Sequence, residues 1–521
     1  MSDENRTDVV EIADICIHRS IPYGVLNDEF ITSSARKTFF AELNKIFTYY
    51  DTYRKGKDFA VDCGTDYVPS TLKFKKARNL INKEARFMFS TPIDFYVNKD
   101  QNETDVQKNN NTILFNFLRN VLDKNFFDKN ILKASKDCFI AGRVGCILNF
   151  NGDSGISVDF LNALEFYYEM QGPDMLTKFV AFFTDVDADS NTEKRIRKKS
   201  YWMGQDGYCW VKEELYNGAG ILLDILFKEQ ATKFKYIPAV VIFNDGLTSD
   251  VKGESEIEDY ESMEQYFNKL MNSDFDAERK SMNPIRYTIN ASPESTSNLS
   301  SGPGAFWDIQ SDENGVETKN ASVGQIESSM SYSSALSATL DRVDSEMHSA
   351  ASVPNVDSDK LQGLITSGKT LKALYWSMIV RCDEKMQTWG AAVKFIANCI
   401  FDGALLYEDA AKFYTNEDIP LVEVIIDIDN NYALPEDEQD EKNVDLAEVS
   451  AQVMSRSSYM KKWRKLTDKE IESELRQIAY ESELLSGNSF GFDESDKSDD
   501  DAEDDSLLED PNMSVDAQSG Q

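Results

Sequence analysis

The chain has 521 residues, of which 41% are hydrophobic and 11% aromatic, which is enough for a large core and for about two to four domains. Its formal net charge is −36, and the stretch from Asp493 to Asp510 alone holds eleven acidic residues and one lysine. A body this acidic repels nucleic-acid phosphates on average. Tight binding of a duplex through a broad basic face is therefore disfavoured, whereas loose passage of DNA past the surface is not.

Neither the N-terminal residues nor the interior predicts a membrane segment. No run of 18 or more apolar residues is present, and residues 1–14 are acidic and lack the apolar core of a signal peptide. We therefore expect the chain to fold in the cytoplasm where it is made. The seven cysteines are scattered and the only histidines are His18 and His348, so we predict reduced buried thiols, no metal or cofactor and no His-based catalytic site.

The first half of the chain predicts helices followed by strands. Apolar residues three or four positions apart predict helices over 33–54, 71–89 and 110–142, and the second of these is basic on its other side. From 143 to 246 the period changes to two, with Gly, Asn and Asp between the apolar runs. This block predicts a meander of antiparallel strands.

Two long helices are predicted on either side of a small β module. The first covers residues 254–281 and ends before Pro284, and residues 285–320 then contain two strand candidates, around Tyr287 and Phe306. A Ser/Ala-rich helix is predicted from Ser322 to Ser352. Its narrow apolar stripe leaves two alternatives: poor order, or close packing of identical helices side by side.

The C-terminal part begins with a flexible segment and the longest helix. The apolar positions from Leu371 to Ile400 recur every three or four residues, which predicts a helix over 370–401. A strand is expected at 420–427, followed by an acidic linker and two or three polar helices that end near Leu485. The acidic tail from Gly487 is predicted to be disordered.

Residues 363–370, G-L-I-T-S-G-K-T, satisfy the pattern of a nucleotide-binding P-loop. A functional P-loop needs a buried parallel strand directly before the first glycine, so that backbone N–H groups point at phosphate. The residues before Gly363 lack a β-branched run and are interrupted by Pro354. The favoured interpretation is a helix start at Lys369, and a P-loop ATPase remains the alternative.

Two further sequence patterns are weaker evidence for a binding site. Asp185, Asp187 and Asp189 have calcium-loop spacing, but Ser190 and Ile196 replace the expected Gly and Glu, so a turn is favoured. The basic run K-R-I-R-K-K at 194–199 could contact phosphate, although a solvated hairpin tip is favoured. No catalytic constellation is evident.

The order of the parts resembles the portal proteins of tailed bacteriophages with long non-contractile tails, over residues 30–487. The segments that carry this resemblance are Y-R-K-G-K-D-F at 53–59, A-R-N-L-I-N-K-E-A-R-F-M-F-S-T-P-I-D-F at 77–95, Y-I-P-A-V-V-I-F-N-D-G at 236–246, the acidic helix at 254–274, and S-G-K-T-L-K-A-L-Y-W-S-M at 367–378. Each segment is degenerate, and their order is the specific part.

The resemblance implies an α+β portal fold, with long stem and wing helices and an antiparallel β meander. The implied divisions follow the chain: N-terminal part of the wing 1–251, stem helix 252–283, clip 284–321, second stem helix 322–350, tunnel loop 351–366, long wing helix and strand 367–430, crown 431–487 and disordered acidic tail 488–521.

The implied function is a ring of twelve subunits at one capsid vertex, which is a DNA channel for packaging and ejection and not an enzyme. The implied partners are other copies of the chain, double-stranded DNA, the large terminase, head-completion or adaptor proteins, and the major capsid and scaffolding proteins, without a membrane or a cofactor. The protein would be a virion component that assembles in the host cytoplasm. A capsid scaffold or adaptor without a channel is a further alternative.

The resemblance also places two sets of site residues. Those that would face DNA in the tunnel loop are Val353, Pro354, Asn355, Asp359 and Lys360. Those that would dock the terminase or adaptor on the clip are Pro293, Phe306, Trp307 and Asp308.

Overall fold

A computed structural model of the chain describes most of its length. The described residues are 23–26, 32–60, 68–98, 104–172, 175–186, 194–247, 250, 252–282, 285–296, 307–311, 320–326, 330–355, 372–432 and 438–487. They belong to two compact units, Met1–Pro435 and Glu436–Gln521, and each unit is described by itself.

The first unit begins with helices whose ends follow from their capping residues. After a short 3-10 turn, η1, come four α-helices, two of which begin at a threonine side chain that accepts from the helix. Their bounds are η1 Tyr23–Leu26, α1 Ser33–Lys55, α2 Lys76–Phe89, α3 Asp105–Lys124 and α4 Phe127–Ala141.

Two of the predicted helices differ from expectation. The single helix predicted over 110–142 is two helices, because Phe126 adopts a left-handed backbone with φ of 50° that ends α3 and turns the chain into α4. The helix predicted from 71 begins only at Lys76, since the preceding residues are extended and their backbone amides bond elsewhere.

The predicted antiparallel strands over 143–246 are confirmed, but they form two sheets instead of one meander. One sheet has the order β3-β2-β9, and the other has five strands in sequence order, β4 to β8. The bounds are β2 Arg143–Asn151, β3 Gly155–Asn162, β4 Phe166–Gln171, β5 Met175–Val186, β6 Lys194–Met203, β7 Cys209–Asn217, β8 Leu222–Ala231 and β9 Ala239–Phe243.

The basic run at 194–199 is not a hairpin tip, as was predicted, but the body of strand β6. Lys198 is only 1% exposed and lies 3.5 Å from Glu214 on β7, while Arg197 lies 3.3 Å from Glu213. Consecutive basic residues of one strand face consecutive acidic residues of the next, so these cations stabilise the sheet. Asp187 and Asp189 lie outside the described residues.

The long helix α10, Trp376–Leu406, packs against β2 and β9 and against a two-stranded sheet made of β1, Asp94–Val97, and β12, Ile426–Asp429. The predicted apolar stripe is confirmed for most of its length, because Met378, Cys382, Trp389, Val393, Ile396 and Ile400 are all buried. Two predicted positions differ, since Leu374 is exposed and Met386 is half-buried. The predicted strand at 420–427 is shifted, since only residues from Ile426 are a strand. A four-residue helix, α11 Glu408–Ala411, lies between α10 and β12.

By length and composition, α10 is the one helix within the described ranges that is apolar enough to cross a membrane. However, 61% of its most apolar window is buried inside the protein. Its hydrophobicity is accounted for by packing on the sheets, as in the core helix of a globular domain.

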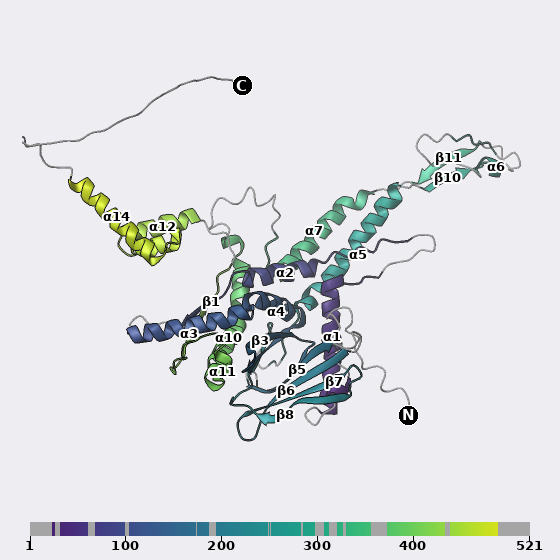
Figure 1. The fold of residues 1–521 in the computed structure, drawn as a ribbon. Helices are drawn as coiled ribbons and strands as arrows, with labels where there is room; N and C mark the ends of the chain where they lie inside the picture. Colours follow the sequence, from purple (N-terminus) through teal and green to yellow (C-terminus); the bar gives the residue numbers. More distant parts are fainter. Residues whose placement is uncertain are drawn as a thin grey trace, which may run out of the picture. The chain divides into compact units, whose positions relative to one another are not determined.

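Two long helices lie side by side and carry a β-hairpin at the end farther from α2 (Figure 1). We call these elements the arm. Its parts are α5 Glu256–Met282, β10 Ile285–Ile289, α6 Pro293–Thr296, β11 Ser322–Ile326, η2 Met330–Tyr332 and α7 Ser333–Ala350.

The prediction of a helix from Ser322 is wrong at its N-terminal end. Residues Ser322–Ile326 are strand β11, which pairs antiparallel with β10, and α7 begins only at Ser333. The β-branched Val323 and Ile326 favour a strand next to β10. The second predicted strand, around Phe306, lies outside the described residues, and Trp307 to Gln310 are not a strand, although Ala291 bridges to Ser311.

The second unit confirms the predicted polar helices. It contains α12 Glu438–Ser450, α13 Arg456–Tyr459, the π-helix η3 Met460–Arg464 and α14 Asp468–Gly487. Trp463 donates from its indole nitrogen to Asp445 at 2.6 Å and joins η3 to α12. Thus the described residues confirm the α+β class, with antiparallel sheets and long helices.

Candidate functional site at the base of the arm

The position of the first residues of α5 is fixed by close backbone contact between two glycines. Gly142, with φ of 80°, ends α4, and a Cβ added to Gly253 would lie only 1.9 Å from the Gly142 carbonyl oxygen. Asn244, at the end of β9, donates its side-chain amide to Glu254 O at 2.9 Å, and its backbone N–H bonds Gly142 O at 2.8 Å. Only glycine permits this approach, so α4, β9 and the start of α5 converge on one point.

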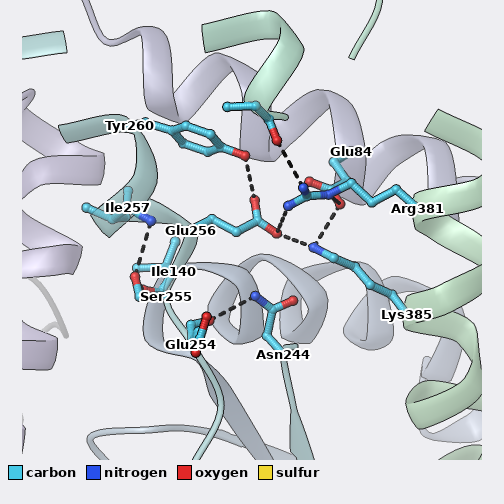
Figure 2. Close-up of polar contacts among 11 residues, drawn as sticks. Glu84, Ile140, Asn244, Glu254, Ser255, Glu256, Ile257, Tyr260, Arg381 and Lys385 are labelled. Carbon is cyan, nitrogen blue, oxygen red and sulfur yellow. Dashed lines mark hydrogen bonds and ion pairs between the residues drawn. The ribbon is translucent and has the colours of Figure 1, made fainter. Parts of the chain in front are cut away.

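Ser255 adds a polar tie at the same place. Its hydroxyl accepts from Ile257 N at 3.2 Å, which caps α5, and donates to the carbonyl oxygen of Ile140 near the end of α4 (Figure 2). The first turn of the arm is therefore bonded directly to the body.

An extended segment, residues 68–75, and the first residues of α2 to Ala77 run along α5 and are held by its side chains. Glu264, Asn268, Asn272 and Asp276 are four residues apart on one helix face, and they accept from the backbone N–H groups of Ala77, Phe74, Leu72 and Ser70 at 2.7–3.0 Å. Asn272 also donates to Leu72 O at 2.7 Å. We call this segment the strap.

The strap can follow α5 because four residues of helix and two residues of extended chain have nearly the same length. Four residues of helix rise about 6.0 Å, and two residues of extended chain rise about 6.6 Å. Side chains at every fourth position of α5 can therefore meet alternate amides of the strap, and every buried amide on that side gains an acceptor. The ring of Phe74 packs between Phe267 and Phe275 of the same helix.

A cluster of buried charges lies at the base of the arm, and we call it the base cluster. It consists of Glu84 on α2, Glu256 on α5, and Arg381 and Lys385 on α10 (Figure 2). The side chains of Glu84 and Glu256 are each 1% exposed and that of Lys385 is 2% exposed. Two acids and two bases balance in charge, which burial of this depth requires.

The geometry of the base cluster joins three helices of the body and arm. Lys385 Nζ lies 2.8 Å from Glu84 Oε1 and also contacts Glu256 Oε1. Arg381 donates from Nε to Glu84 at 2.9 Å, and its Nη2 lies 3.3 Å from Glu256. Tyr260, one turn along α5, donates to the other oxygen of Glu256 at 3.5 Å.

The same arrangement separates the pKa values of the two carboxyl groups. Burial and repulsion from Glu84 raise the pKa of Glu256 to about 7. Burial also acts on Glu84, but attraction to Lys385 and Arg381 outweighs it and holds the pKa of Glu84 below its ordinary value. Despite burial, the two carboxylates raise the pKa of Lys385 and of Arg381. Glu256 is thus the group of the base cluster that changes charge near neutral pH.

Beyond its base, the arm is only partly covered by the chain itself. The buried residues of α5 end at Asn272, and α7 buries only Met347. Met282 is 79% exposed, and Ile289 and Val323 of the hairpin are each 50% exposed. These apolar side chains are available for contacts with other molecules.

The predicted tunnel-loop residues have different surroundings. Val353 is 4% exposed and packs in the core, which does not favour a contact with DNA. Pro354 is half-buried, and Asn355 is exposed and donates to Asp344 on α7 at 3.1 Å. Asp359 and Lys360 lie outside the described residues, as does the whole of 363–370 with Lys369.

The predicted clip residues lie on and beside the hairpin. Pro293 begins α6 and is exposed, as is Asp308. Trp307 is half-buried, and the guanidinium of Arg286 on β10 lies 4.9 Å from the centre of its ring. Phe306 lies outside the described residues.

No feature of the described residues favours catalysis. All strand pairs in the described part of the chain are antiparallel, whereas a P-loop needs a parallel strand. The described cysteines, Cys138, Cys146, Cys209, Cys382 and Cys399, are buried free thiols. Burial raises the pKa of Cys209 and of Cys399 to about 12, which removes thiolate reactivity. The described ranges also contain no group of three or more potential metal ligands.

Hydrophobic periodicity did not reveal the base cluster or the strap. Glu84, Glu256 and the pair Arg381 and Lys385 lie in three distant parts of the sequence, and each looks like a solvated helix residue by itself. The polar positions 264, 268, 272 and 276 were a detectable pattern, since polar residues at every fourth place follow the helix next to its apolar stripe.

This architecture defines a mixed α and β protein with two long helices that leave the body, carry a hairpin and return to it. A family model for phage portal proteins, SPP1 Gp6-like, matches residues 33–484, so the chain belongs to this family. The family is structural rather than enzymatic, and membership implies a capsid-associated oligomeric component of the virion vertex. No curated protein matches the chain.

Proposed function

We propose that this chain assembles into a ring, of twelve subunits in the particle, whose central channel passes DNA during packaging and ejection. In this proposal α5 and α7 are the stem, and residues 284–326 are the clip that docks the terminase and later the head-completion proteins. The α/β body with α10 is the wing, residues 351–366 are the tunnel loop, and residues 431–487 are the crown.

The observation that carries this proposal is the incomplete burial of the arm. Two helices of 27 and 18 residues lie side by side, yet α7 buries one residue within its own chain. A helix pair of this length is stabilised when copies of itself stand beside it, and a closed ring gives every copy the same neighbours. The family match adds that such chains belong at a capsid vertex.

The net charge of −36 agrees with a channel that holds DNA through few contacts. Each phosphate neutralised by a lysine or arginine adds affinity, and affinity slows sliding. A net charge of −36 disfavours a broad set of such contacts. The terminase, in this proposal, supplies the energy for movement.

Negative-stain imaging and mass measurement of the purified chain test the proposal. We expect rings with a central hole. A stable monomer at high concentration, or a compact oligomer without a hole, contradicts the channel and favours a scaffold or adaptor. Nucleotide binding that is lost in Lys369→Ala, in the absence of rings, favours the ATPase.

A further inference from the structure

A cationic pocket lies between α2 and the end of α7. The cavity has a volume of about 310 Å³. Its polar lining includes Lys76, Asn79, Asn82, Lys83 and Arg86 of α2, together with Asn355 just beyond α7. We call it the α2 pocket.

The basic side chains of α2 line one pocket because their spacing in the sequence places them on the same helix face. Lys76, Lys83 and Arg86 are seven and three residues apart, with Asn79 between them, which places all four on one helix face. Lys83 and Arg86 are exposed, and within the described residues neither forms an ion pair. Their positive charge is therefore available to a ligand.

The one acid of the pocket is already neutralised. Asp344 lies 2.7 Å from Lys76 Nζ and accepts from Asn355 at 3.1 Å. His348 bonds the carbonyl oxygen of Val353 through Nδ1 at 3.1 Å, and burial, reinforced by Lys83, lowers the pKa of His348. At neutral pH His348 is thus uncharged, and Lys83 and Arg86 leave the pocket with two net positive charges.

Donors dominate the rest of the lining. The side-chain oxygen of Asn82 accepts from Tyr53 OH at 2.8 Å, so its NH₂ group remains as a donor. Nearby, Lys136 on α4 has a pKa lowered by burial and by repulsion from Arg86 and Arg78. Cations crowded in this way repel one another, and a bound anion relieves that repulsion.

We propose that the α2 pocket binds a phosphate group of the DNA backbone. A guanidinium, an ammonium and amide N–H groups around one small cavity match a phosphate, whose oxygens accept several hydrogen bonds at once. The source of the phosphate rests on the proposed function, because Asn355 lies in the loop assigned to the channel, residues 351–366. The contact carries no base information and acts on any sequence passing the loop.

The test measures binding of a short fluorescent duplex of arbitrary sequence by anisotropy over a series of salt concentrations. The variant Lys83→Gln/Arg86→Gln is compared with Lys228→Gln/Lys235→Gln, which removes the same charge from exposed positions outside the pocket. We expect the pocket variant to lose on the order of ten-fold in affinity at low salt and its salt slope to fall by about one, the value for one neutralised phosphate. The control retains both.

Three results overturn the proposal: equal affinity and slope in pocket variant and control, phosphate alone binding while the duplex does not, or altered assembly of the pocket variant with unchanged DNA binding. The last result assigns the pocket to a carboxylate of a second copy. Imaging of the same samples tests ring assembly separately from phosphate binding by the α2 pocket. Rings without a DNA effect reject the pocket alone, whereas missing rings reject the proposed function and leave the binding comparison to decide the pocket.

Discussion

Arg381 donates a hydrogen bond to the backbone carbonyl oxygen of Ala350 at 3.1 Å. The same guanidinium bonds Glu84 on α2 and contacts Glu256 on α5, so one side chain of α10 touches both arm helices and the body. The planar fork of arginine reaches three groups at once, and the single ammonium of lysine does not.

Arg381→Lys keeps the charge and removes this fork. We expect the free energy of unfolding to fall by about 1.5–3 kcal/mol, since hydrogen bonds that involve charged groups are lost. Hydrogen exchange should increase at the end of α7 and at the start of α5. The exposed Lys372, changed to Arg, is the control. Unchanged exchange at both helix ends would show that the fork does not couple them.

Glu256→Gln tests the charge state of the base cluster. A carboxyl whose folded pKa of about 7 exceeds its ordinary 4.5 binds more protons in the folded state, so it costs the wild type stability as pH rises through this window. Glutamine does not titrate. The stability of the variant relative to wild type should therefore improve by up to about 3 kcal/mol between pH 4.5 and 7.

Urea unfolding at several pH values measures this difference, and Glu278→Gln, exposed on the same helix, is the control. The quantity compared is the free energy of unfolding of the variant minus that of the wild type. A value that stays constant, or that decreases as pH rises, would falsify the assignment of the titrating group to Glu256.

Asn268→Ala and Asn272→Ala each remove an acceptor from the strap. The N–H of Phe74 or of Leu72 is then left without its partner, at a cost of about 1–3 kcal/mol per variant. Cleavage by protease within 68–77 should accelerate. Lys269→Ala, exposed on the same helix, should leave the cleavage rate unchanged, and equal rates in all three variants would contradict the strap.

Gly253→Ala tests the contact at the entry to α5. The added methyl would lie 1.9 Å from Gly142 O, so backbone must move, and we expect a loss of about 1–3 kcal/mol in a thermal or urea unfolding experiment. Gly152→Ala is the matched control, because its Cβ would meet only Asp409 at an ordinary 3.5 Å. Similar losses in both variants would mean that the contact is not specific.

The sequence predicted the elements better than their connections. The stripes of α5 and α10 were found because burial of Ile257, Tyr260 and Trp389 follows the helical period. The start of α7 was misplaced since Val323 fits both periods and only its pairing with Thr288 settles the choice. Lys198 looked solvated because its partner, Glu214, is known only from the sheet register.

The site was harder to predict from the sequence than the fold. Val353 was assigned to a channel from its place in a family pattern, but its side chain fills the core. Glu84 and Glu256 are far apart along the unit, and their shared lysine is another 129 residues away from Glu256. Only the packing of α2, α5 and α10 brings these charges together.

The strap has a consequence for how this arm can vary between related chains. Four residues of helix rise about 0.6 Å less than two residues of extended chain, so the mismatch between the two repeats grows with each further hydrogen bond. The step from Phe74 to Ala77 takes three residues instead of two, because the chain has entered α2 at Lys76 by that point. Past Asp276 and Arg279, no further hydrogen bond to the strap occurs within the described residues. Insertions of whole turns there would lengthen the reach of the hairpin without disturbing these bonds.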